Sequence, residues 1–146
     1  LCGKSYGAKD LPSFCLFTSR LLRWGIGIAL VATIIYIGGG RLFLQLITDS
    51  SSVLATSEVY FYWVVLIPLA GFLAFVLDGI YIGATMTRYM LISSFLSAVS
   101  FFVAYFSLSA LLGNHALWLA FILYLAVRGI VQRLLLNRVQ LKITSI

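Results

Sequence analysis

The sequence predicts an all-α membrane protein with four antiparallel transmembrane helices. Of its 146 residues, 62% are hydrophobic and only 10% are charged, and the mean hydropathy is +1.09. A soluble domain carries about 25% charged residues, and a chain of this size cannot hide so much apolar surface in a core. The apolar residues also gather in runs that approach or exceed the roughly 20 residues that cross a bilayer as a helix. Together these observations exclude an ordinary soluble enzyme domain and a disordered tail.

Helices are expected rather than strands because of the length of the runs. A transmembrane strand needs about 9–11 residues with alternating polar and apolar positions, and no run here shows sustained alternation. A helix also satisfies every backbone polar group within its own segment, which the bilayer interior requires.

Turn-forming residues separate four predicted spans, which are 21–48, 60–83, 89–112 and 116–136. The first span ends near three glycines and is interrupted by Arg41, and the second opens with four aromatic residues and contains Pro68. The third ends at the turn that begins with Gly113. The fourth must include Arg128, because its uncharged part, 116–127, is too short to cross the membrane.

The remaining segments are expected at the two membrane surfaces. They are a cytoplasmic loop and lead-in over 1–20, outer loops over 49–59 and 113–115, an inner loop over 84–88 and a cytoplasmic tail over 137–146. Asp49 or one of the serines after it could cap a short helical lead-in that contains Glu58. The three-residue outer connection is typical of antiparallel neighbours.

The positive charges predict the orientation of the chain. With four spans, both termini and the loop around Arg88 lie on one side, together with eight of the ten Lys and Arg residues. These eight are Lys4, Lys9, Arg20, Arg23, Arg88, Arg133, Arg138 and Lys142. The opposite side holds only Arg41, so the positive-inside rule places both ends of the segment in the cytoplasm. Membrane lipid with anionic headgroups accounts for the net charge of +6, and no nucleic-acid partner is expected.

The positions of the tryptophans agree with this predicted orientation. Trp24 falls at the inner membrane boundary, whereas Trp63 and Trp118 fall at the outer one, as expected for interfacial belts. His115 is expected in the short outer loop near the start of the fourth span.

Two charged residues inside the spans are the candidate site. Asp78 lies five residues before Gly83, and Arg128 lies five residues before Arg133, so both sit about 7–8 Å in from these inner markers. A charge in the membrane costs several kcal/mol unless it is paired or hydrated. An Asp78–Arg128 contact is one hypothesis. The alternatives are that Arg128 extends to the inner headgroups and that Asp78 reaches water or serves as a cation or proton site.

The third span carries a stripe of small and polar residues. Its members recur at spacings of four, three, four and three, and they are Ser93, Ser97, Ser100, Ala104 and Ser107. Such spacing places them on one helix face. The stripe could serve close helix packing, which in membranes depends on small residues, or it could form a wall of a transport cavity. Another face of this span is apolar and suits lipid, with Phe95, Val99, Phe102 and Phe106.

The sequence does not point to an enzyme. It contains no Ser/His/Asp set, no cluster with metal-ligand spacing and no phosphate-binding glycine loop, so neither a metal nor an organic cofactor is expected. Cys2 and Cys15 are too few and too poorly spaced for a disulfide framework or a zinc site, and are expected to be reduced thiols.

Three segments carry a resemblance to a known family. They are GKSYGAKD over 3–10, LDGIYIGAT over 77–85, and GNHALWLA over 113–120, which is followed by Arg128-Gly129. In this order they resemble the cytoplasmic G-x-x-x-G-A segment, the matching helix end and the last hairpin of multidrug and toxic compound extrusion (MATE) transporters. The similarity is to the DinF-like subfamily.

The resemblance implies that this chain, which starts at Leu1 rather than Met, is a C-terminal fragment equivalent to the last four helices of a twelve-helix, two-lobe transporter. Its partners would be the N-terminal part of the same transporter and a small drug-like substrate. The family exports cationic or amphipathic compounds in exchange for protons or sodium ions, here across a bacterial inner membrane. Some members use a carboxylate on the helix that corresponds to the second span, which makes Asp78 the candidate cation or proton residue and Arg128 its candidate partner. A lipid-linked oligosaccharide flippase of the same superfamily and a non-transporting four-helix membrane anchor subunit are the alternatives.

Overall fold

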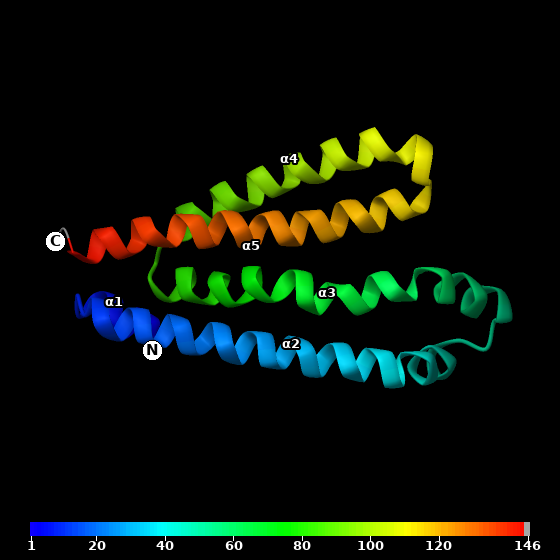
Figure 1. Cartoon of the computed structure of the whole chain (residues 1–146), viewed down its shortest axis with the longest axis horizontal. Helices are drawn as coiled ribbons and strands as arrows, with labels where there is room; N and C mark the ends of the chain where they lie inside the picture. Colours follow the sequence, from blue (N-terminus) through cyan, green and yellow to red (C-terminus); the bar gives the residue numbers. More distant parts are fainter. Residues whose placement is uncertain (145–146) are drawn as a thin grey trace.

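In a computed structural model of the chain, long antiparallel helices lie side by side in one row (Figure 1). The structure describes residues 1–144. Its helices are α1 (Cys2–Gly7), α2 (Leu11–Ile47), α3 (Ser51–Gly83), α4 (Thr87–Leu112) and α5 (Asn114–Thr144). Across the row the order is α2, α3, α5, α4, because α5 folds back between α3 and α4. This order makes α3 and α5 neighbours, and the candidate site lies between them.

Within residues 1–144, four helices are long and apolar enough to cross a membrane, and the candidate spans are Leu11–Gly40, Ser52–Gly83, Thr87–Leu112 and Asn114–Gln140. The multi-pass, all-α membrane class is therefore confirmed. Both α1 and the carboxyl end of α5 lie at one end of the row, together with the α3–α4 connection (Figure 1). We call this the inner end.

The helices are longer than the predicted spans. With 37 residues, α2 is about 55 Å long at 1.5 Å per residue, whereas the hydrocarbon core is about 30 Å thick. Most of the expected outer loop over 49–59 belongs to α3, and the expected tail over 137–146 is helical to Thr144. Neither segment contains a proline or glycine that would end a helix, so each helix continues beyond the predicted span.

The start of α2 is defined by a polar cap. The Ser13 backbone N–H donates to Asp10 Oδ1 at 3.0 Å, and Pro12 follows within the first turn. Hydrogen bonding by the Ser13 side chain and backbone holds the pKa of the exposed Asp10 carboxyl below its usual value. At the start of α3, Ser50 occupies the N-cap position.

The best-packed core lies at the inner end, where α1, α2, α3 and α5 each contribute buried residues. Its buried members are Cys2, Phe14, Leu77, Ile80, Tyr81, Leu136 and Val139. A Cβ at Gly3 would collide with the Gly83 carbonyl oxygen, so the first glycine of the G-x-x-x-G-A segment allows α1 to cross the end of α3. Elsewhere many large apolar side chains are exposed, as expected for surfaces that face lipid or other helices.

Candidate functional site

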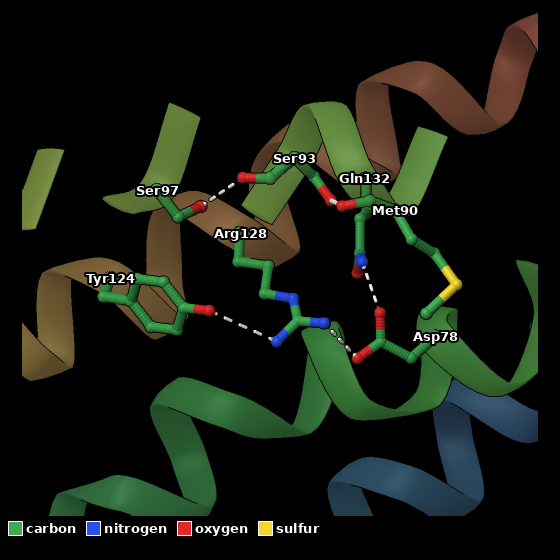
Figure 2. Close-up of polar contacts among 7 residues, drawn as sticks. All are labelled: Asp78, Met90, Ser93, Ser97, Tyr124, Arg128 and Gln132. Atoms are coloured by element: carbon green, nitrogen blue, oxygen red, sulfur yellow. Dashed lines mark hydrogen bonds and ion pairs between the residues drawn. The ribbon is translucent and has the colours of Figure 1, made fainter. Parts of the chain in front are cut away.

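A polar cluster joins α3 to α5 near the inner end of the membrane spans (Figure 2). Asp78 comes from α3, and Tyr124, Arg128 and Gln132 come from α5. The three α5 residues are spaced by four, so they lie one turn apart on a single helix face. We call these four residues the inner polar cluster.

Each oxygen of the Asp78 carboxylate has a donor. Arg128 Nη2 lies 2.8 Å from Asp78 Oδ2, and Gln132 Nε2 donates to Asp78 Oδ1 at 2.6 Å. Arg128 Nη1 also donates to the Tyr124 hydroxyl at 3.4 Å. The structure therefore places the guanidinium against the carboxylate, a charge-assisted arrangement that is stronger than a neutral hydrogen bond.

The side chains of the inner polar cluster that contact Asp78 are largely buried, as is Asp78 itself. The Arg128 and Asp78 side chains are 18% and 16% exposed, and Gln132 is completely buried. Two polar atoms, Arg128 Nε and Gln132 Oε1, are buried without a hydrogen-bond partner among residues 1–144. Loss of one member would leave the other as a largely buried, unpaired charge, which costs several kcal/mol.

Gln132 and Tyr81 are members of this region that the sequence reasoning missed. Tyr81 is fully buried, and its hydroxyl donates to the Gln132 backbone carbonyl at 2.6 Å, which adds a second link between α3 and α5. The available signal for Gln132 was its polarity within the fourth span and its position one turn after Arg128. Tyr81 gave no comparable signal, because tyrosine near a helix end is equally suited to the membrane interface.

A glycine allows the two helices to approach closely beside the charge pair. A Cβ at Gly129 would lie 3.0 Å from Leu73 Cβ and 3.1 Å from the Ala74 backbone nitrogen. Ala74 and Leu77, on the facing side of α3, are fully buried. Small residues at such crossings are typical of membrane helix packing.

The burial of the serine stripe decreases along α4. Ser93 and Ser97 are fully buried, Ser100 is half-buried and Ser107 is exposed. The Ser93 hydroxyl donates to the Met90 carbonyl at 2.8 Å, and that of Ser97 donates to the Ser93 carbonyl at 2.7 Å (Figure 2). Each of these two hydroxyls thus donates to a backbone carbonyl of its own helix, and the small side chains leave room for close packing. The opposite phenylalanine face is exposed, with Phe95 at 68%.

An aromatic cluster joins α3 to α5 at the opposite, outer end. We define this outer aromatic cluster by its members Tyr60, Tyr62, Trp63, His115 and Trp118. Trp63 Nε1 donates to His115 Nδ1 at 3.1 Å, and the Tyr62 hydroxyl lies 3.1 Å from the same nitrogen. The ring centroids of Tyr60 and His115 are 4.9 Å apart. Because an indole N–H can only donate, His115 Nδ1 accepts in this arrangement.

Within the part of the chain that the structure describes, no group of three His, Cys, Asp or Glu side chains could hold a metal ion. Arg128 and Gln132 each contact one oxygen of the Asp78 carboxylate, so this carboxylate links α3 to α5.

Comparisons with known proteins agree with this architecture. Residues 1–106 match the family described as MatE. The chain is 33% identical over 128 residues to DNA damage-inducible protein F of Escherichia coli (strain K12), an alignment that covers 88% of this chain and 28% of that protein. The chain therefore spans less than a third of the length of this curated relative. No solved structure matches. The match over 106 of 146 residues confirms the resemblance carried by the three sequence segments: the chain belongs to the MatE family, that is, the multidrug and toxic compound extrusion transporters.

Proposed function

We propose that this chain forms part of a secondary active transporter that exports cationic or amphipathic compounds in exchange for protons or sodium ions. The observation that carries the proposal is the Asp78–Arg128 pair, buried between two membrane-spanning helices of a MatE-family chain. Charged residues within membrane spans are costly and commonly mark ion or substrate pathways.

In this proposal the protein lies in a bacterial inner membrane, with the inner end of the row in the cytoplasm. The positive-inside rule supports this orientation, because eight of the ten Lys and Arg residues belong to the segments predicted on that side. The chain spans 28% of its relative's length, so other segments of the same transporter would supply most of the path for a drug-like substrate.

The coupling step would take place at Asp78. A proton on its carboxylate would remove the charge that holds Arg128, and a sodium ion would compete with the guanidinium directly. Either event weakens the link between α3 and α5 at the inner end. A transporter needs such a linkage, because the coupling ion must bind the two alternating conformations with different affinity.

A transport assay of the full-length protein tests the proposal. Expressed in an efflux-deficient host, it should lower the accumulation of a cationic dye, and a protonophore or the removal of sodium should abolish this effect. Asp78→Asn should remove the energised component of export when dye levels are normalised to the amount of folded protein in the membrane. Asp49→Asn is a matched control, because Asp49 precedes α3 at the outer end and lies outside the inner polar cluster.

Two results would contradict the proposal at different levels. Unchanged dye levels across a broad panel of cationic compounds would refute drug export. Full, energised export by Asp78→Asn would leave export standing but would refute the role of Asp78 in coupling.

A further inference from the structure

A cavity of about 620 Å³ lies at the inner end of the molecule, separate from the inner polar cluster. It is bounded by α1, the connection from α3 to α4, the first turns of α4 and the last turns of α5. Its volume falls within the roughly 300–1,000 Å³ of small-molecule sites, but such sites are mostly apolar and this one is lined by many polar residues. We propose that this cavity binds the phosphate group of an anionic phospholipid headgroup.

Two arginines give the cavity its charge. Arg88 lines it from the start of α4, and Arg138 lines it from the last turns of α5. In the part of the chain that the structure describes, neither guanidinium has a hydrogen-bond or ion-pair partner. The chain has four acidic residues in all, and Asp78, the one on the inner part of α3, is already paired with Arg128. Asp10, at the start of α2, accepts a hydrogen bond from the Ser13 backbone N–H and does not line the cavity. Among the described residues the lining thus holds two arginines and no carboxylate, and the fork of an arginine matches phosphate oxygens well.

Neutral donors complete the lining. Tyr6 and Thr87 bring hydroxyl groups to the cavity, whereas the Thr85 hydroxyl, which also lines it, donates to the Ala84 carbonyl at 2.7 Å. The 26-residue helix α4 also begins here at Thr87, with no acidic residue in its first turn. The partial positive charge of a helix start adds to the field of the arginines and favours an anion.

The position of the cavity favours a lipid over free phosphate. Ile92, one turn after Arg88, and Leu135 supply apolar lining, and the neighbouring Leu91 and Leu134 are 72% and 67% exposed. A phospholipid could thus place its phosphate between the arginines while its acyl chains follow the apolar outer surfaces of α4 and α5. Free phosphate would use the polar part of the cavity alone.

Native mass spectrometry of the purified full-length protein tests the proposal. The probes are phosphatidylglycerol, phosphatidylcholine and inorganic phosphate, each titrated against the same protein concentration. Because each arginine adds favourable energy with an anionic lipid, we expect Arg88→Gln/Arg138→Gln to reduce bound phosphatidylglycerol about tenfold. Arg20→Gln/Arg23→Gln removes the same charge from the inner part of α2 outside the cavity and should keep wild-type binding. Inorganic phosphate at millimolar concentration should not displace the lipid.

Three results would overturn the proposal. Equal loss in the two double variants would mean that general basic charge, and not this cavity, retains the lipid. Equal binding of phosphatidylcholine and phosphatidylglycerol would remove the role of the anionic headgroup. Displacement by inorganic phosphate would assign the cavity to a soluble phosphate. All three readouts are independent of dye export, so this proposal and the transport function can fail separately.

Discussion

The two contacts between α3 and α5 use different chemistry at the two ends of the same helix pair. The inner polar cluster is a buried ion pair with an amide and a phenol around it. The outer aromatic cluster joins neutral rings through two contacts to one imidazole nitrogen. Loss of one partner therefore has different consequences at the two ends.

At the inner end, a missing partner leaves a charge where neither water nor lipid can stabilise it well. At the outer end, a missing N–H leaves a neutral group at the membrane boundary, where water can replace it. The inner contact is therefore the more sensitive one to loss of a partner, and the outer contact tolerates change. The following predictions test this difference, from the largest expected effect to the smallest.

Breaking the ion pair should cost the most. Arg128→Gln leaves the Asp78 carboxylate without its cation, and we expect the free energy of unfolding of the full-length protein to fall by roughly 3 kcal/mol. Denaturation in mixed detergent micelles measures this change. Asp78→Asn/Arg128→Gln should lose less than the sum of the single variants, because no lone charge remains. Additive losses would mean that the two residues do not stabilise each other.

The second-largest loss of stability should come from adding a side chain at Gly129, where α5 approaches α3 beside the ion pair. Gly129→Ala places a methyl group 3.0–3.1 Å from Leu73 and the Ala74 backbone, and we expect a loss of about 1–3 kcal/mol in the same unfolding measurement. Gly27→Ala in α2 is the matched control, because a Cβ there meets nothing within 4 Å. It should be neutral or slightly stabilising, since alanine favours the helix. Similar losses in both variants would argue against a close α3–α5 crossing.

The outer aromatic cluster should respond more weakly. Trp63→Phe keeps an aromatic ring but removes the N–H that donates to His115, so we expect a loss of about 1 kcal/mol. Trp24→Phe, at a position that is 73% exposed, should change less. Thermal unfolding of the two variants in identical micelles makes the comparison. A Trp63→Phe loss as large as that of Arg128→Gln would remove the distinction between the two ends.

The cap of α2 should show the smallest effect, and this effect should depend on pH. The pKa of Asp10 is lowered in the folded protein, so its stabilising contribution is present at neutral pH. The contribution is lost as the pH falls through the lowered folded pKa. The stability difference between wild type and Asp10→Ala should therefore shrink on acidification. A difference that grows towards low pH would contradict the capping contact with Ser13.

The membrane class and the pairing of the two charges could be anticipated from sequence, because hydropathy and residue spacing are one-dimensional quantities. Asp78 and Arg128 were assigned equal depth from their distances to inner markers, and the structure brings them into contact. The order of the helices in the row could not be predicted from hydropathy. Lipid and protein neighbours are similarly apolar, so nothing in the hydropathy of α5 shows that it contacts α3 as well as α4.

The finer features of the site depend on this neighbour relation. Gln132 could be noticed as a polar residue, but its bond to Asp78 follows only from the α3–α5 contact. Gly129 was part of a family resemblance, and its physical role emerges only when Leu73 and Ala74 lie against it. The helix ends at Ser51 and Thr144 were placed differently because hydropathy marks where the membrane ends and not where a helix ends.

The position of Asp78 ahead of Arg128 in the chain also bears on biosynthesis. A growing chain releases its helices from the ribosome in order, so α3 is available in the bilayer before α5 is complete. An arginine raises the insertion cost of a segment by up to about 2.5–3.5 kcal/mol at its centre and by less nearer an end, as at Arg128, and a carboxylate that already lies in the membrane offsets part of that cost. The ion pair would thus help α5 to enter the membrane, in addition to holding the finished fold.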